Sequence, residues 1–552
     1  MVMSQSQMEP SVSSFKKRFT LFAPYLKWVK LCASWLPEAL ELQKENVEWS
    51  AEVEVPDGRH SYYFKLPSLS PFNQGREVSV ADPYARLIQE AELDQAVIVV
   101  ENGQDVTTQY AWQHDDVPLP SDDDLVIYEC HVGEFAFQND QIGTFKGVSE
   151  KIGYLKELGI TALELMPIMS FPMDKSWGYN VRHPFAPEQT YGTPQDLKAL
   201  IDQCHAQGIR VILDLVLNHQ ESNSPLSQID YYYWFRDSRP DEQSFGPKFD
   251  YERTDETTII DGAPARPAMR YALEVARYWV QEYHIDGYRL DATAVIDNFE
   301  LVQAIRDIGK ANSGGKPFYV TAEQLPENPA IASPDGPADG AWHRQFREAV
   351  VAALISRGTN LEPLASSIQP RNHGYSSPSR MVNYIESHDE TTFLERLARD
   401  GMTGNAAFCS AKLAAVFLLT AVGNAMLYQG QEFGGFRPLD LEVRPLQWEL
   451  LDAEFGLHLK THYAYLIRAR HESSALKGEE LEILKAEDGW LAYRRGYGEA
   501  EVIVVANLHE EDRSLDLPLP DGHWHEMLFD YSLDTPANES VPGLCAKIYT
   551  HV

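Results

Sequence analysis

The chain of 552 residues is longer than one domain usually is, so we expect two or three domains. A composition of 44% hydrophobic and 23% charged residues is typical of globular proteins and argues against disorder. Asp and Glu outnumber Lys and Arg by 82 to 47, which gives a formal net charge of −35. A charge of this sign repels nucleic-acid backbones and anionic membrane surfaces, but it does not disfavour a neutral substrate.

The cysteines and the N-terminal segment predict a cytoplasmic protein. The five cysteines are widely spaced, odd in number and without a CxxC pair, which favours reduced thiols over a disulfide framework or a zinc site. No apolar core of a signal peptide follows the basic residues at 16–18. The longest apolar run, 413–427, is too short for a membrane span. We therefore expect no membrane partner, and nothing in the chain calls for a cofactor.

The first 113 residues have the pattern of a β-sandwich. Short segments in which apolar and polar residues alternate are typical of half-buried strands. These segments are 19–23, 27–31, 49–55 and 60–66, and the last two flank the turn sequence PDG at 56–58. An acidic stretch with two prolines follows at 114–124 and predicts a linker.

From residue 125 to 475 the pattern changes to strands that alternate with helices. The expected strands are 125–129, 161–166, 210–217, 287–291, 319–323, 381–385 and 425–428, with one further repeat poorly marked near 358–376. A helix is expected over 342–355. Strict alternation of this length predicts a (β/α)₈ barrel, interrupted by an inserted loop at about 220–265. The remaining residues, 476–552, return to a β pattern and predict a small C-terminal β-sandwich.

Three of the expected barrel strands end on an acidic residue. Their sequences are GYRLD at 287–291, YVTAE at 319–323 and YIESHD at 384–389. In a parallel α/β barrel the C-terminal ends of the strands share one face, where active sites are built. Three carboxylates there can supply a nucleophile, a general acid/base and a third anion that shapes the transition state. Such a set suits chemistry at the anomeric carbon of a sugar.

These segments resemble the signatures of the α-amylase superfamily, glycoside hydrolase family 13. The four signature-like segments are, in order, DLVLNH at 214–219, GYRLD at 287–291, AE at 322–323 and HD at 388–389. SWGY at 176–179 and MLYQGQE at 426–432 are also similar to family sequences. The resemblance covers about 125–434. The N-terminal part, which contains ADPYA at 81–85, resembles the family-48 carbohydrate-binding modules that precede many branching and debranching enzymes.

The resemblance implies a catalytic role for each carboxylate. Asp291 would be the nucleophile that forms a covalent glycosyl–enzyme. Glu323 would be the general acid that protonates the leaving oxygen and then the base that activates the acceptor. Asp389 would hold sugar hydroxyls and favour distortion of the ring. Arg289 would lie on the same face of its strand as Asp291 and keep that carboxylate ionised.

The resemblance also implies a set of substrate-binding and supporting residues. His219 and His388 would donate hydrogen bonds to sugar hydroxyls, and both could instead be buried structural histidines. Tyr179 would stack on the sugar at the point of cleavage, or would belong to the core. Asp214 and Asn218 would organise the end of their strand. No cluster of oxygen ligands for calcium is recognisable between 220 and 265, so we predict no metal.

Two groups of aromatic residues allow more than one interpretation. The run YYYWF at 231–235 could stack on sugar faces, but the core of the inserted loop is the favoured interpretation. Trp28, Trp35 and Trp49 could form a glycan platform, yet a buried sandwich core is the simpler interpretation. Both alternatives remain open at this point.

The resemblance leaves the exact reaction open. A glycosyl–enzyme can be resolved by water, as in a hydrolase, or by a sugar hydroxyl, as in a transglycosylase. ELMP at 164–167 is similar to both branching enzymes and maltooligosyltrehalose trehalohydrolases, and the sequence around 383–389 resembles pullulanases. Gln324, which follows Glu323, departs from the branching and trehalohydrolase patterns. We expect a retaining α-glucan hydrolase acting on starch, glycogen or maltooligosaccharides, with a branching enzyme or a trehalohydrolase as the alternatives.

A function of another class is a non-catalytic glucan-binding relative. Such relatives lack members of the carboxylate triad, whereas this chain keeps Asp291, Glu323 and Asp389. Function has to be argued from the site, and the intact triad favours an enzyme.

Overall fold

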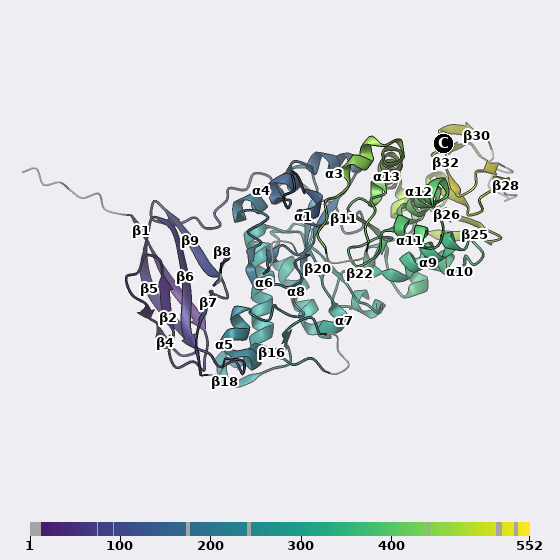
Figure 1. The fold of residues 1–552 in the computed structure, drawn as a ribbon. Coiled ribbons are helices and arrows are strands. Elements are labelled where there is room, and N and C mark those ends of the chain that lie inside the picture. The colour runs from purple at the N-terminus through teal and green to yellow at the C-terminus, as the bar shows by residue number, and fades with distance from the viewer. Residues whose placement is uncertain are drawn as a thin grey trace, which may run out of the picture.

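The computed structural model describes residues 13–73, 75–91, 93–172, 177–239, 244–438, 442–514, 522–534 and 539–551. Three parts follow one another along an elongated molecule: an N-terminal β module, a central α/β barrel and a C-terminal β part (Figure 1). No helix among these residues is long and apolar enough to cross a bilayer. All five cysteines carry free thiols.

Eight parallel strands form a closed barrel, which confirms the predicted fold class. In barrel order the strands are β11 (Val126–Cys130), β12 (Ala162–Leu165), β15 (Arg210–Leu215), β20 (Gly287–Leu290), β21 (Tyr319–Ala322), β22 (Gly340–His343), β23 (Met381–Tyr384) and β24 (Asn424–Tyr428). The pairing of β24 with β11 closes the ring. Most of these strands are buried along their whole length, as expected for a parallel sheet covered by helices.

The position of the weakly marked repeat was predicted wrongly. The missing strand is β22 (Gly340–His343), which lies before the helix α9 (Arg344–Ile355), whereas residues 342–355 were expected to be helical throughout. The segment 358–376 holds α10 (Glu362–Ser367) and a short 3₁₀ turn (Pro370–His373) instead. A strand of only four residues that begins with Gly and Ala has little β propensity of its own, and its pairing with β21 and β23 fixes it.

Local sequence signals mark the ends of some of the outer helices. The outer helices include α3 (Ile152–Leu158), α4 (Pro194–Ala206), α6 (Pro267–Tyr283), α8 (Phe299–Asn312), α11 (Phe393–Arg399) and α12 (Gly404–Thr420). Thr193 and Asp196 form a capping box at the start of α4. Gly159 ends α3 in the left-handed conformation. Short helices α1 (Val132–Phe135), α2 (Phe145–Ser149) and α7 (Thr293–Ile296) follow or connect the strands.

An apolar layer fills the interior of the barrel. Its members come from different strands and are fully buried: Leu125, Ile127, Ala162, Ile212, Tyr319, Trp342, Val382, Tyr384 and Met426. Side chains of a strand alternate between its two faces, so the residue two positions further on also points inward. The next inward layer therefore contains Glu129, Glu164, Asp214 and Arg289, each two residues after a buried position of the strand.

The N-terminal module consists of two antiparallel sheets around one core. One sheet has the order β1 (Ser14–Phe22), β5 (Glu48–Pro56), β4 (Gln43–Glu45). The other contains β10 (Gln104–Asp105), β9 (Gln95–Glu101), β6 (Gly58–Pro67), β2 (Lys30–Ala33) and β3 (Leu40–Glu41), with β7 (Glu77–Val80) and β8 (Ile88–Gln89) beside it. Trp49 is buried in the core, whereas Trp28 and Trp35 are half-buried. The division into domains stays a prediction.

The N-terminal module packs against the barrel through the segment 81–85. Tyr84 Oη donates to Glu274 of α6 at 2.6 Å, and Tyr271 Oη of the same helix donates to the Pro83 carbonyl at 2.9 Å. Asp82 accepts a hydrogen bond from Tyr62 Oη at 3.0 Å within the module. The segment thus fixes the module to one barrel helix.

The region between 220 and 265 is compact and has regular elements of its own. It holds α5 (Pro225–Trp234) and the short strands β16 (Phe235–Arg236), β17 (Lys248–Phe249), β18 (Asp255–Ile260) and β19 (Ala263–Ala265). Within the aromatic run 231–235, four side chains are buried and Tyr232 is 46% exposed. The run therefore serves mainly as core, as the favoured interpretation holds.

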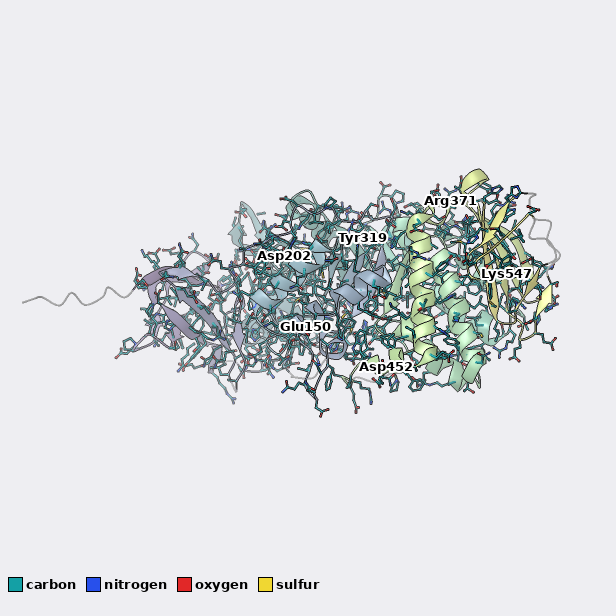
Figure 2. All side chains as sticks on the ribbon, turned by 90° about the horizontal axis from the view of Figure 1, so that it is seen from above. Glu150, Asp202, Tyr319, Arg371, Asp452 and Lys547 are labelled. Carbon is teal, nitrogen blue, oxygen red and sulfur yellow. The ribbon has the colours of Figure 1, made fainter. Side chains whose placement is uncertain are left out.

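The C-terminal part combines helices and a β-sheet. The helices α13 (Glu454–Glu472) and α14 (Ser474–Lys477) lead into a sheet ordered β25 (Leu481–Glu487), β26 (Trp490–Arg495), β27 (Val502–Asn507), β32 (Cys545–His551), β29 (Trp524–Glu526) and β30 (Tyr531–Leu533). A second, two-stranded sheet joins β28 (Arg513–Ser514) to β31 (Ser540–Val541). Lys547 of β32 lies at the far end of the molecule from the N-terminal module (Figure 2).

The packing of α8 onto the start of β21 yields a stability prediction. A Cβ at Gly309 would lie 2.1 Å from the Phe318 ring, so Gly309→Ala should lower the free energy of unfolding by about 1–3 kcal/mol through overpacking. Gly153 in α3 is exposed with no atom within 4 Å of a Cβ, so Gly153→Ala should raise that free energy by about 0.5–1 kcal/mol. Thermal unfolding of the two variants measures both effects, and an equal rise of Tm in both would contradict the packing.

Candidate active site

The ends of four barrel strands bring the predicted site residues together. Asp214 of β15 pairs in register with Arg289 of β20, and Leu290 pairs with Ala322 of β21. Asp291 and Glu323 each follow the last residue of a strand, so the register places them side by side. Asp389 comes five residues after the end of β23. All of them lie at the C-terminal face of the barrel, as the sequence predicts.

The guanidinium of Arg289 lies at the centre of this site. Its Nη1 donates to Asp291 Oδ1 at 2.8 Å and to both carboxylate oxygens of Asp214 at 2.9 and 3.0 Å. Its Nη2 is 2.9 Å from Glu323 Oε2 and 4.0 Å from Asp389 Oδ2. Arg289 is fully buried, and Trp342 lies against it with 4.7 Å between the guanidinium carbon and the ring centroid. One cation thus holds four carboxylates.

Glu323 has the environment of a proton donor. Burial raises the pKa of its carboxyl to about 7; Arg289 opposes this shift, and the charges of Asp291 and Asp389 add to it. Its Oε2 accepts a hydrogen bond from the Ala292 backbone N–H at 2.8 Å. Near neutral pH, Glu323 therefore exchanges a proton readily, as a general acid/base must.

Ala292 makes this arrangement possible through an uncommon backbone conformation. Its φ of 47° and ψ of 45° lie in the left-handed region, which a residue with a Cβ seldom adopts. The turn aims the Ala292 N–H at Glu323. Thr293, the next residue, donates from both its N–H and its hydroxyl to the Glu323 carbonyl, at 3.0 and 2.7 Å. The strand ends that carry Asp291 and Glu323 are therefore tied together by their backbones.

Gln324, which departs from the family pattern, has a structural partner in the same turn. Its amide oxygen accepts from the Thr293 hydroxyl at 3.0 Å, and its side chain is largely buried. The residue therefore supports the turn that holds Glu323.

A second network holds Asp389 at the open side of the site. His388 Nε2 lies 3.3 Å from Asp389 Oδ2, and His388 Nδ1 lies 2.5 Å from Glu129 Oε1. Burial opposes a charged His388, but the two carboxylates outweigh it and raise the pKa of the imidazole well above its usual value. Burial would likewise raise the pKa of Asp389, yet His388 and Arg289 hold that pKa far below its ordinary range. The Asp389 side chain is 48% exposed, so a charged group faces the approach to the site.

Tyr179 lies between these two networks. Its ring stacks on His388 with 5.0 Å between centroids, and its hydroxyl donates to Asp214 Oδ2 at 2.6 Å. Its neighbour Trp177 contacts the His388 ring edge-on at 5.6 Å. Ser176, which begins the SWGY segment, lies outside the described residues.

His219 and Asn218 lie after the end of β15. The Asn218 amide lies 3.3 Å from His219 Nδ1, and both side chains are buried. Burial lowers the pKa of His219, and the charge of Asp291 acts against that shift. A neutral imidazole beside the predicted nucleophile can donate to a sugar hydroxyl without adding a charge.

Two buried carboxyls and a tryptophan were not predicted as site residues. Glu129 accepts a hydrogen bond from His388, and Trp342 covers Arg289. Glu164 lies on the strand between β11 and β15. Neither of its carboxyl oxygens is hydrogen-bonded within the described part of the chain. Burial raises the pKa of Glu164 well above its ordinary value, and Glu129 adds to the shift. The signal was present, because Glu129 and Glu164 also lie at the ends of apolar strands.

Part of the chain matches a known family model. Residues 135–360 match the model of the alpha-amylase catalytic domain. This segment is similar to the alpha-amylase catalytic domain, and the relatives of the chain are glycosidases and transglycosylases. The matched segment contains Asp214, Arg289, Asp291 and Glu323, whereas Asp389 lies beyond it.

Curated relatives of this chain carry three different names. A malto-oligosyltrehalose trehalohydrolase of Saccharolobus solfataricus is 29% identical over 60% of this chain and 61% of its own length. A pullulanase of Bacillus subtilis is 28% identical over 77% of this chain and 68% of its own. A 1,4-alpha-glucan branching enzyme of Bacillus caldolyticus is 24% identical over 91% of this chain and 79% of its own length. The chain thus spans less than two thirds of the first of these relatives.

Solved structures support the same fold. The type I pullulanase of Bacillus subtilis, solved with maltose, superposes with a TM-score of 0.81 over 99% of this chain and 86% of its own. The two sequences are 22% identical in that superposition, so the likeness concerns the fold.

The pKa of Glu323 predicts the alkaline limit of activity. With Glu323 as the predicted general acid, which must be protonated to act, kcat/KM on an α-glucan should fall as the pH rises through about 7. Glu323→Gln should lower kcat by about 10²–10⁴-fold on a glucan and much less on an α-glucosyl fluoride, whose leaving group needs no proton. A pH–rate profile with both substrates measures this. An alkaline limb that persists in Glu323→Gln would assign the limb to another group.

The buried contact between Glu129 and His388 predicts a pH-dependent loss of stability. The pKa of His388 is raised in the folded state. The contact therefore stabilises the fold fully at pH values below the unfolded-state pKa of about 6.5, and this stabilisation is lost as the pH rises through the folded-state pKa. Glu129→Gln should lower the folded-state pKa of His388. At pH values below that pKa, it should also lower the free energy of unfolding by about 3–5 kcal/mol. Denaturant unfolding between pH 5 and about pH 9 measures the difference. Glu348→Gln, which breaks an exposed pair with Arg344, is the control and should change little.

Proposed function

We propose that this chain is a retaining α-glucan hydrolase that cleaves α-glucosidic bonds of starch, glycogen or maltooligosaccharides. The observation that carries the proposal is the pairing of Asp291 and Glu323 with neighbouring nitrogens of one buried guanidinium. Asp291 bonds directly to Arg289, whereas burial raises the pKa of Glu323 to about 7. Two carboxyls in different environments can act as nucleophile and acid at the same pH.

The proposed reaction proceeds in two steps. An Asp291 oxygen attacks the anomeric carbon, the glycosidic C–O bond breaks, and Glu323 gives its proton to the departing oxygen. Water then attacks the anomeric carbon, gives its proton to Glu323, and breaks the bond to Asp291. Each step returns Glu323 to the state that the other step needs. Asp389, held by His388, would accept hydrogen bonds from the ring hydroxyls, and Tyr179 would pack beside the sugar.

A trehalohydrolase is the second candidate, and the 29% identity to the Saccharolobus enzyme favours it. It uses the same two steps with water, on an α-glucosidic bond that ends in trehalose. A branching enzyme is the alternative with a sugar as acceptor, supported by the relative from Bacillus caldolyticus. The carboxylates do not distinguish these reactions, because water and a sugar hydroxyl attack the same intermediate.

We also propose the domain division of the chain. Residues 1–113 would form a carbohydrate-binding-type module, 114–124 a linker, 125–475 the catalytic barrel and 476–552 a C-terminal sandwich. A hydrophobic core formed mainly by residues of the N-terminal module, which Ala186 and Ile229 of the barrel part join, supports the first boundary. Free thiols at all five cysteines fit a cytoplasmic location.

The product profile tests the proposal. Incubation with soluble starch, pullulan and maltooligosyl-trehalose should release reducing sugar from starch or pullulan, and release of trehalose would assign the second candidate. New α-1,6 branch points without reducing sugar would contradict the hydrolase. Asp291→Asn should lower turnover by about a thousandfold or more, because the nucleophile is lost. The exposed Asp307→Asn of α8 is the control and should retain turnover.

A further inference from the structure

A cavity of about 480 Å³ lies where the N-terminal module meets the barrel. The module contributes the loop between β6 and β7, with Ser70, Phe72 and Asn73. The barrel contributes α5, including Tyr231, and the segment before β17, including Gly246. Pockets that take small ligands have volumes of roughly 300–1,000 Å³, so this cavity has the size of a binding site. In Figure 1, α5 and β16 lie beside the lower end of the module.

Hydrogen bonds to backbone carbonyls of α5 hold the two parts together. Leu69 N–H donates to the Ile229 carbonyl at 2.9 Å, and the Ser68 hydroxyl donates to the Gln228 carbonyl at 2.6 Å. These carbonyls are accessible because α5 is interrupted at Asp230, whose φ of −159° and ψ of 92° are not helical. The loop of the module is thereby fixed over the cavity.

The lining of the cavity suits a neutral, hydroxyl-rich ligand. Among its described residues are serine hydroxyls, asparagine and glutamine amides and the single carboxylate of Asp237, and none is basic. The Ser70 hydroxyl is buried and has no hydrogen-bond partner within the described part of the chain.

Phe72 supplies an aromatic face at the mouth of this cavity. Its side chain is 71% exposed, which is unusual for a large apolar group, and its ring meets the edge of Tyr231 with 5.3 Å between centroids. An exposed ring held in place by another ring can stack on the apolar face of a sugar.

The far wall of the cavity is shared with the candidate active site. Gly246 lies against His219, because a Cβ at Gly246 would be 3.2 Å from the imidazole and 2.4 Å from the Gln220 carbonyl oxygen. The Gln220 N–H donates to the Pro247 carbonyl at 3.1 Å. The Phe245 ring, 44% exposed, lies 5.6 Å from the His219 ring. A chain bound at His219 therefore has the cavity as its immediate neighbour.

We propose that this cavity is a distal subsite for a neutral α-linked glucosyl unit of the substrate chain, and that Phe72 of the N-terminal module stacks on that unit. The inference rests on the proposed function, because it names where the far end of a bound glucan lies. It assigns the module a direct part in the choice of substrate length. A long glucan would reach both the carboxylates and Phe72, whereas a short one would reach the carboxylates alone.

Binding to an inactivated protein tests the subsite without turnover. Calorimetric titration of Asp291→Asn with maltoheptaose gives a reference Kd, and adding Phe72→Ala should raise that Kd about tenfold, in line with the loss of one stacking contact. Phe72→Trp in the same background should keep the Kd near the reference. The control is Phe529→Ala, which removes an aromatic ring of similar exposure in the C-terminal part and should leave the Kd unchanged. An unchanged Kd in Phe72→Ala would overturn the proposal.

Turnover on substrates of two lengths gives the second readout. In the otherwise native protein, Phe72→Ala should lower the ratio of kcat/KM for maltoheptaose to that for maltotriose about tenfold. An equal loss on both substrates would show damage to the fold or the catalytic site and would contradict a distal subsite. If the native protein releases no product from any glucan, the proposed function fails, and the binding series on Asp291→Asn still decides the subsite.

Discussion

The burial of Arg289 is the constraint on which the site depends. A guanidinium without solvent contact is stable only where carboxylates and hydrogen bonds replace its water. Asp214, Asp291 and Glu323 do so at direct-contact distances. The carboxylates that stabilise Arg289 repel one another, and burial raises the pKa of Glu323 to about 7 and that of Asp214 to about 6. The proposed division of roles between acid and nucleophile would therefore follow from one cation with several anionic neighbours.

The barrel supplies this arrangement through its register and its two-residue alternation. Apolar side chains such as Ile127 and Ile212 fill the interior, and Glu129 and Asp214 form the layer two residues further along the same strands. The apolar layer excludes water from below and raises the cost of an unpaired charge. Asp214 and Glu129 find partners in the networks through Arg289 and His388, whereas Glu164 has no hydrogen bond within the described part of the chain and its pKa is raised by burial.

The N-terminal module and the inserted region enclose a cavity beside the candidate site. The insert contains α5 and packs four aromatic rings into its core, so it presents a fixed surface to the module. A cavity between two rigid parts keeps its shape. This favours binding because the protein loses little conformational entropy when a ligand enters. The position of Phe72 beside this cavity connects the module to the barrel chemistry.

The sequence by itself determined the barrel class, the strand-end carboxylates and the residues around them. Alternating apolar runs and strand ends are local patterns, and GYRLD at 287–291 could be placed on a strand end without any tertiary contact. It also predicted the neighbourhood of Arg289 and Asp291, because they are two residues apart on one strand. The strand at Gly340–His343 could not be located in this way, since four residues carry too little pattern and its neighbours define it.

Only the tertiary structure decided which charged groups contact one another and which surfaces meet. Glu129 and His388 are 259 positions apart in the chain, and no local pattern relates them. The left-handed turn at Ala292, the shifted pKa of Glu323 and the cavity between Phe72 and Gly246 likewise arise from contacts between distant segments. Sequence patterns report the preference of a segment for an environment, whereas burial and charge at one point depend on every segment that the fold brings there.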